Sequence, residues 1–198
     1  MDDAKRDRAV CIACSIFKNE LERLRSQGRF FLDTDYLDSA LHLYPQELQT
    51  QLDRAIKTHR QQQDKILLLF GDCHAYMCDY ADEPGIARIK GVNCCQIVLE
   101  AQEYQGLHSD GAFFLLPEWA LRWQEIIKAY IGLPQAQAQE FMREMHSGFI
   151  YVDTGIVPVP VHELDALAEF FGLTVTIKRV GLEPFLLHIQ HVLQELDR

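Results

Sequence analysis

Thiol, imidazole and carboxylate side chains stand together directly after one strongly apolar segment of the sequence. The segment KILLLF at residues 65–70 is apolar after its first residue, and GDCH at residues 71–74 follows it. Thiolates and imidazoles are the ligands that zinc prefers in proteins, and thiolates also hold iron–sulfur clusters. We therefore expect Cys73 and His74 to be metal ligands, with Asp72 as a cofactor-binding residue beside them.

Two further cysteines also follow predicted strands. Cys14 ends the apolar segment AVCIAC, and Cys94 follows the segment IARIKG. Because the carboxyl ends of parallel strands meet at one edge of a sheet, Cys14, Cys73 and Cys94 are expected at a common metal site. Three protein ligands leave the fourth position of a zinc ion open for a substrate, as in catalytic zinc sites.

Burial is the alternative explanation for each cysteine taken alone. Free cysteine is among the residue types most often buried in proteins. Cys11 lies inside a predicted strand, so we expect it in the core despite its Cys-x-x-Cys spacing to Cys14. Adjacent side chains point in different directions, so only one of Cys94 and Cys95 is expected in the site. If every thiol is a packing residue, substitutions will lower stability and leave binding unchanged.

The elements that position these residues alternate between short apolar segments and longer segments of helical period. This alternation predicts an α/β fold with a largely parallel sheet flanked by helices, Rossmann-like, in a single domain over residues 1–198. The predicted strands lie at residues 9–14, 29–32, 65–70, 85–91, 111–117, 149–153 and 173–180. The predicted helices lie at residues 15–27, 46–63, 94–105, 118–132, 134–148, 162–172 and 183–196.

Composition narrows the partners and the compartment. With 29 acidic and 19 basic residues the formal net charge is -10, which disfavours nucleic acid and anionic membrane surfaces as partners. No segment has the roughly 18 consecutive apolar residues of a membrane helix, and no signal peptide precedes the first strand. We therefore expect a cytoplasmic protein with reduced thiols. Glycine-rich nucleotide-binding motifs and the Gly-x-Ser-x-Gly elbow of serine hydrolases are both absent from the sequence.

Several motifs in order resemble one family of bacterial and archaeal proteins, the domain of unknown function 1638. They are IACSIFKNEL, LHLYPQEL, LLLFGDC, the NC pair at residues 93–94, FFLLPEWALRW and GFIYVDTG. The order of these motifs carries the resemblance, since no single motif is diagnostic. The resemblance implies that Cys14, His42, Cys73 and Cys94 are the family's site residues, with His42 as a cofactor-binding residue.

The sequence departs from the family pattern at two positions near these residues. The residue after Cys73 is usually glycine in the family and is His74 here. A histidine is common two positions before the third cysteine, where this sequence has Val92. If that histidine is a ligand in the family, His74 is a candidate to replace it.

Two functional hypotheses arise from these residues and from the resemblance. The first is a metal-binding protein with zinc or an iron–sulfur cluster, acting on a small-molecule substrate in methyl or one-carbon transfer. Members of the family often lie near genes for corrinoid-dependent methyltransferases, an association that adds a corrinoid to the candidate cofactors. The second hypothesis is therefore a non-catalytic accessory or cofactor-binding module that serves a corrinoid protein.

Overall fold

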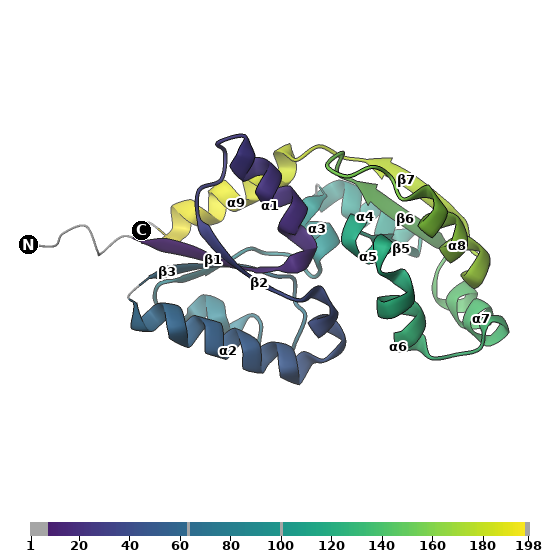
Figure 1. Cartoon of the computed structure of the whole chain (residues 1–198), viewed down its shortest axis with the longest axis horizontal. Coiled ribbons are helices and arrows are strands. Elements are labelled where there is room, and N and C mark those ends of the chain that lie inside the picture. Colours follow the sequence, from purple (N-terminus) through teal and green to yellow (C-terminus); the bar gives the residue numbers. More distant parts are fainter. Residues whose placement is uncertain (1–7, 63, 100, 197–198) are drawn as a thin grey trace, which may run out of the picture. The chain divides into compact units, whose positions relative to one another are not determined.

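The structure is a computed structural model that describes residues 8–62, 64–99 and 101–196. The chain divides into two compact units (Figure 1). Unit 1 lies within residues 1–97 and 183–198, and unit 2 lies within residues 98–182. Each unit has its own parallel sheet.

Unit 1 contains a four-stranded sheet in the order β2-β1-β3-β4, with every neighbouring pair parallel. The strands are β1 (Ala9–Cys14), β2 (Asp33–Leu37), β3 (Lys65–Leu69) and β4 (Ile86–Arg88). Side chains of both central strands are buried on both faces of the sheet, as in the apolar segment of β3. The edge strand β2 has the polar sequence DTDYL and is partly exposed.

Helices cover both faces of this sheet (Figure 1). They are α1 (Lys18–Ser26), α2 (Pro45–Gln61) and α9 (Glu183–Leu196), whereas the short helix α3 (Cys94–Val98) follows β4 and ends beyond the boundary of unit 1. Helix α2 lies on one face, and it buries Leu48, Leu52 and Ile56, which recur every fourth residue along one side. Helices α1 and α9 lie on the other face, so the last helix of the chain returns to the sheet of the first half.

Unit 2 contains a three-stranded parallel sheet in the order β5-β6-β7. Its strands are β5 (Ala112–Leu115), β6 (Gly148–Asp153) and β7 (Val175–Arg179). Its helices are α4 (Ala101–Ser109), α5 (Pro117–Leu121), α6 (Ala129–Ile131), α7 (Gln135–Met145) and α8 (Val161–Phe171), with a π-helical segment at Gln124–Lys128. Contacts among the rings of Trp123, Phe149 and Phe171 form part of its core.

The predicted α/β class with parallel strands and flanking helices is confirmed, but the strands form two sheets instead of one. The single domain predicted over residues 1–198 stays a prediction, since two compact units can belong to one domain. The strand predicted at residues 29–32 is wrong, because the strand begins at Asp33 and Phe31 is 79% exposed. An edge strand with an exposed side lacks the apolar signal on which that prediction relied.

Helix boundaries differ from the predictions in two further places. The helix predicted at residues 118–132 is divided into α5, the π-helical segment and α6. The helix predicted at residues 94–105 is divided into α3 and α4. Residues 63 and 100, which fall in two predicted helices, lie outside the described residues. No helix within the described ranges is long and apolar enough to cross a membrane.

Candidate functional site

The strand order of unit 1 creates a reversal between β1 and β3. The chain passes from β1 outward to β2, then returns across β1 to β3 and continues to β4. In open parallel sheets, ligands bind at the carboxyl ends of the strands where the strand order reverses in this way. Cys14 is the last residue of β1, and Cys73 lies in the loop that follows β3. These two thiols therefore stand on either side of the reversal.

The two outer strands each add one more donor at the same edge. After β2 the chain forms a 3₁₀ helix at Ser39–Leu43, which contains His42. After β4 a short loop leads to α3, of which Cys94 is the first residue. Each of the four strands of this sheet is thus followed by, or ends in, one sulfur or nitrogen donor.

The structure brings these four side chains together in a chain of hydrogen bonds. Cys94 is hydrogen-bonded to Cys14 and to Cys73, and Cys73 is also hydrogen-bonded to His42. Cys14 is buried, Cys73 and Cys94 are half-buried, and His42 is exposed. We call Cys14, Cys94, Cys73 and His42, in that order, the thiol cluster. It runs from the core of unit 1 to its surface.

The contacts within the thiol cluster favour the protonated thiols of Cys73 and Cys94. The hydrogen bond to Cys94 and then burial raise the pKa of Cys73 well above its ordinary value, although His42 acts to lower it. The hydrogen bond to Cys14 and burial likewise raise the pKa of Cys94, although the hydrogen bond to Cys73 acts to lower it. The hydrogen bond to Cys73 raises the pKa of His42, and burial opposes that rise. The protonation states of Cys73, Cys94 and His42 are therefore coupled, because each group changes the pKa of the group to which it is hydrogen-bonded.

Two loops of the site are held against each other by backbone contact at Gly71. A Cβ atom at Gly71 would lie 2.6 Å from Cα and 2.8 Å from the carbonyl carbon of Asn93. Only glycine permits this approach, because the obstructing atoms belong to the backbone and cannot turn away. The contact joins the loop that carries Cys73 to the loop that carries Cys94.

The position of Cys94 is fixed further by hydrogen bonds at the start of α3. The Asn93 side chain accepts a hydrogen bond from the backbone N–H of Gln96 at 2.9 Å. The Gln96 side chain in turn accepts one from the backbone N–H of Val92 at 2.7 Å. The first of these bonds is that of an N-cap residue to the third residue of the helix, and the second ties the residue before the cap to the same turn, so together they hold the start of α3 in place. It explains why a polar residue precedes Cys94 in the sequence.

His74, predicted as a metal ligand, contacts other residues than the thiol cluster. Its Nδ1 accepts a hydrogen bond from the backbone N–H of Tyr76 at 3.2 Å, and its ring lies edge-on to that of Tyr80 with centroids 5.8 Å apart. The Nε2 atom is buried and has no hydrogen-bond partner among the described residues. Burial lowers the pKa of His74, so its neutral form is favoured. The imidazole in the cluster is that of His42.

Asp72, predicted to bind a cofactor, is paired with a cation of the protein itself. Its carboxylate lies 2.7 Å from the guanidinium of Arg88, whose side chain is only 7% exposed. The thiol of Cys78 donates a hydrogen bond to Asp72 at 3.8 Å and accepts one from Arg88 at 3.7 Å. Arg88 is not among the site residues predicted from the sequence, although it ends a strand, where site residues are expected.

The remaining cysteines have separate surroundings. Cys11 is fully buried, which confirms its assignment to the core, and burial raises its pKa to about 12. Cys95 is also buried, and burial alone raises its pKa to about 12. Of the adjacent pair, Cys94 is therefore the member of the thiol cluster. Cys78 is exposed and belongs with Asp72 and Arg88.

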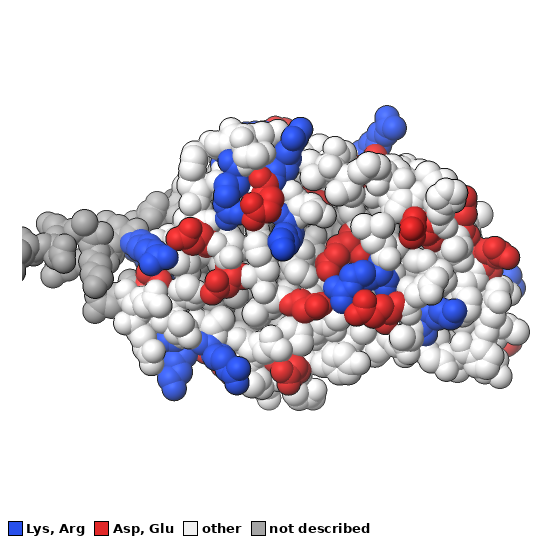
Figure 2. All heavy atoms as spheres, viewed as in Figure 1, with Lys and Arg blue, Asp and Glu red and all other residues white. Residues whose placement is uncertain are grey.

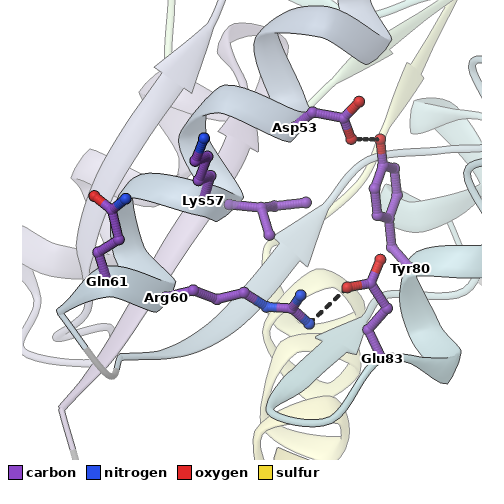
Figure 3. A pocket seen from close by; sticks show the side chains of 7 residues that line it. Asp53, Lys57, Arg60, Gln61, Tyr80 and Glu83 are labelled. Atoms are coloured by element: carbon purple, nitrogen blue, oxygen red, sulfur yellow. Dashed lines mark hydrogen bonds and ion pairs between the residues drawn. The ribbon is translucent and has the colours of Figure 1, made fainter.

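A separate cavity of about 460 Å³ lies beside α2 in unit 1 (Figure 3). The Tyr80 hydroxyl donates a hydrogen bond to Asp53 across it at 2.7 Å, and Arg60 forms an ion pair with Glu83 at 2.6 Å. The charged groups drawn together in Figure 3 thus largely satisfy one another. Lys57 is the lining cation outside these two pairs.

No ligand set for a metal is preformed. Among residues 8–62, 64–99 and 101–196, no group of three or more His, Cys, Asp or Glu side chains is arranged so that it could hold a metal ion. The thiol cluster is a linear series of contacts in which each thiol is hydrogen-bonded to a neighbour.

On the face seen in Figure 2, acidic and basic side chains are interspersed.

Fold and site together define an α/β protein with parallel sheets and a thiol–imidazole cluster at a reversal of strand order. The chain belongs to the family described as protein of unknown function (DUF1638), whose model matches residues 36–186. The family resemblance drawn from the sequence motifs is thereby confirmed. The matched range includes His42, Cys73 and Cys94. The chain matches no curated protein and no solved structure.

Proposed function

We propose that unit 1 binds a zinc ion or an iron–sulfur cluster through Cys14, Cys73 and Cys94, with His42 as the fourth donor. The observation that carries the proposal is the delivery of one sulfur or nitrogen donor by each of the four strands to one edge of the sheet. Three thiolates and one imidazole form a known ligand set for zinc. The types of donor therefore fit the proposed metal.

Binding requires the side chains of the cluster to exchange partners. The thiols are hydrogen-bonded to one another, and a metal binds thiolates, so the metal must displace protons from Cys73 and Cys94. The side chains must also turn from each other towards a common centre, because no preformed ligand set is present among the described residues. The backbone contact between Gly71 and Asn93 limits this change to side-chain rotation, since it already holds the two loops together.

The reaction class that we propose is the transfer of a methyl or other one-carbon group from a small-molecule substrate. A metal held by the three thiolates would act as a Lewis acid on a substrate thiol that takes the place of His42, the exposed donor, and the sulfur of that activated thiol would accept the methyl group. The support for this class is the resemblance to a family whose genes often neighbour those of corrinoid-dependent methyltransferases.

Metal analysis after anaerobic purification tests the metal site. We expect about one metal ion per chain in the unmodified protein and less than a tenth of that in Cys73→Ser. Cys78→Ser is the matched control, because Cys78 is an exposed thiol outside the thiol cluster. His42→Ala should weaken binding, whereas His74→Gln should not. The absorption spectrum identifies the metal, since an iron–sulfur cluster is coloured and zinc is not.

Substoichiometric metal that Cys73→Ser leaves unchanged would contradict the proposed metal site. Loss of metal in His74→Gln but not in His42→Ala would instead restore His74 as the ligand. A folded Cys73→Ser variant is required for either conclusion, and its circular dichroism spectrum provides that check.

The second candidate function is a non-catalytic accessory or cofactor-binding module for a corrinoid methyltransferase system. Three large apolar side chains favour it: Tyr44, Tyr76 and Val92 are 62%, 58% and 57% exposed. Each lies within three positions of a member of the thiol cluster in the sequence. Exposed apolar side chains around a site suit a bulky ligand with an apolar face.

A titration with cobalamin, followed by its absorption spectrum, tests this second candidate. We expect Tyr76→Ser to weaken binding, and Phe31→Ser, which removes an exposed aromatic ring remote in sequence from the cluster, to leave it unchanged. Absence of any spectral change with the unmodified protein would exclude binding of the free corrinoid.

A further inference from the structure

A cavity lies at the carboxyl ends of two neighbouring strands in unit 2. Its lining includes Asp153 and Arg179, the last residues of β6 and β7, and part of the segment at residues 155–159 that follows β6. The volume of about 390 Å³ falls within the range of roughly 300–1,000 Å³ that is typical of small-molecule sites. Every lining residue belongs to unit 2, so the cavity is separate from the thiol cluster.

The Asp153 carboxylate is buried at this cavity, and one of its oxygens accepts no hydrogen bond from a described residue. Its Oδ1 atom accepts one from the backbone N–H of Gly155 at 2.9 Å, which orients the side chain. Its Oδ2 atom lies 3.6 Å from Nε of Arg179, which is longer than a hydrogen bond. The side chain is only 8% exposed, and a buried charge without close partners is unfavourable. A ligand that donates a hydrogen bond to Oδ2 would therefore be stabilised there.

Arg179 is the cationic group of the same cavity. It is paired with Asp153 in the register of the two parallel strands, so the two side chains project from the same face of the sheet. The backbone N–H of Val180 donates a hydrogen bond to the Asp153 carbonyl at 2.9 Å, which keeps the strand ends adjacent. The Arg179 side chain is 88% exposed, so it can turn from Asp153 to another anion at little cost.

The remaining side chains of the cavity are apolar. They belong to Val157, Pro158, Val159 and Val180, and the three valines are half-buried. Proline fixes its own φ angle, so Pro158 and Pro160 restrict the backbone that carries two of these valines. An aliphatic group of a ligand would be removed from water against this surface.

We propose that unit 2 binds an aliphatic α-amino acid in this cavity. The ammonium group of the ligand pairs with Asp153, its carboxylate pairs with Arg179, and its side chain packs against the valines. An α-amino acid carries both charges on one carbon atom, so it can reach two protein groups that lie 3.6 Å apart. The ammonium group contributes more affinity than the carboxylate, because Asp153 is buried and Arg179 is exposed.

Isothermal titration calorimetry of the unmodified full chain with four probes tests the proposal. L-Leucine is compared with isoamylamine, which lacks the carboxylate, with 4-methylpentanoate, which lacks the ammonium group, and with glycine, which lacks the side chain. We expect one L-leucine per chain. Isoamylamine should bind about threefold more weakly, and 4-methylpentanoate and glycine more than about tenfold more weakly. Absence of L-leucine binding, or equal binding of either charge-deficient probe, would overturn the proposal.

Variants locate the site and separate its two charges. Asp153→Asn keeps an oxygen for the Gly155 N–H but removes the charge, so it should weaken both L-leucine and isoamylamine by at least about tenfold. Arg179→Gln should weaken L-leucine about threefold and leave isoamylamine unchanged. Lys178→Gln is the matched control, because this neighbouring cation pairs with Glu103 instead. Unchanged L-leucine affinity in a folded Asp153→Asn variant would overturn the site.

The inference goes beyond the proposed function and can fail separately from it. Cys73→Ser should bind L-leucine as the unmodified protein does, because Cys73 belongs to unit 1. A protein that binds L-leucine but no metal refutes only the proposed function. A protein that binds metal but not L-leucine refutes only the amino-acid site.

Discussion

Units 1 and 2 are both parallel α/β assemblies, yet they differ in strand order and in the residues at their strand ends. Unit 1 has the order β2-β1-β3-β4, which reverses direction, whereas the three strands of unit 2 lie in chain order. All six cysteines lie in unit 1. The reversal separates the loops after β1 and β3 and so opens an edge at which donors can meet. A shared fold class thus does not imply a shared site, because connectivity decides where loops converge.

The central strand of unit 2 also ends in a polar residue, but that residue stabilises a turn. Asp153 ends the central strand β6, and its carboxylate accepts a hydrogen bond from the backbone N–H of Gly155 at 2.9 Å. Gly155 has a φ of 71°, which glycine adopts without strain. The motif VDTG is therefore a capped turn.

The largest expected difference between the units concerns added volume at a glycine. Gly71→Ala in unit 1 should destabilise the protein by about 3 kcal/mol, because its Cβ would meet the Asn93 backbone at 2.6 Å. Gly106→Ala in α4 of unit 2 should instead stabilise by about 0.5–1 kcal/mol, since no atom lies within 4 Å of its Cβ. Urea unfolding measures both changes. Equal effects at the two positions would show that the close backbone contact is absent.

The second prediction concerns the pH dependence of metal binding by unit 1. Hydrogen bonding and burial raise the pKa of both Cys73 and Cys94, so a metal must displace a proton from each thiol. Each displaced proton contributes about a tenfold change in affinity per pH unit, so the protons of Cys73 and Cys94 alone should make zinc affinity rise at least about 100-fold per unit as pH increases. Competition with a chromophoric chelator between about pH 6 and 8 measures the slope. A slope near zero would mean that the thiols are already deprotonated or do not bind the metal.

Two half-buried histidines should give the units opposite pH dependence of stability. In unit 1, His59 lies between Asp35 and Asp64, at 2.7 Å and 3.0 Å. Burial opposes its charge, but the two carboxylates outweigh burial and raise its pKa above the ordinary value of 6.5. The stabilisation is therefore complete below pH 6.5 and is lost as pH rises through the raised pKa. In unit 2, burial lowers the pKa of His146 because it disfavours the charged imidazole, so this histidine does not oppose folding above pH 6.5 and lowers stability as pH falls through the lowered pKa.

Replacement of each histidine measures these opposite contributions. His59→Gln should reduce the free energy of unfolding by roughly 1 kcal/mol at pH 6 and by less at pH 8. His146→Gln should flatten the fall in stability below pH 6.5 and have little effect above it. Unfolding curves at several pH values test both statements. The same sign of slope for the two variants would contradict the difference in their surroundings.

The fold class could be predicted from the sequence because the buried strands are apolar on both faces. The segment that forms β3 is an example, and its position at the centre of the sheet is explained by its composition. The edge strand β2 could not be predicted in this way, because DTDYL owes its conformation to pairing with β1 and not to apolar periodicity. The division into two sheets is likewise set by which strands pair, and local composition does not specify pairing.

The candidate site was predictable in part for the same reason. Strand ends located Cys14, Cys73 and Cys94, because parallel strands bring their carboxyl ends together whatever the loops contain. His42 entered only through the family resemblance, since it lies beyond a polar strand that was not recognised. In the sequence His74 is as good a candidate ligand as the adjacent Cys73, but in the structure its ring lies against that of Tyr80. Side-chain direction in an irregular loop depends on packing, which spacing alone does not encode.

The smallest predicted effect compares two aspartates that cap turns in the same way. Asp38 in unit 1 accepts a hydrogen bond from the backbone N–H of Ala40 at 2.8 Å, as Asp153 in unit 2 does from Gly155 at 2.9 Å. Replacing either by alanine should cost about 0.5–1 kcal/mol of stability. Only Asp38→Ala should also weaken zinc binding, because Asp38 caps the 3₁₀ helix that carries His42. An unchanged zinc affinity in a folded Asp38→Ala variant would show that the position of His42 does not depend on this cap, and a changed affinity in Asp153→Ala would show that the effect is not specific to the cap beside His42.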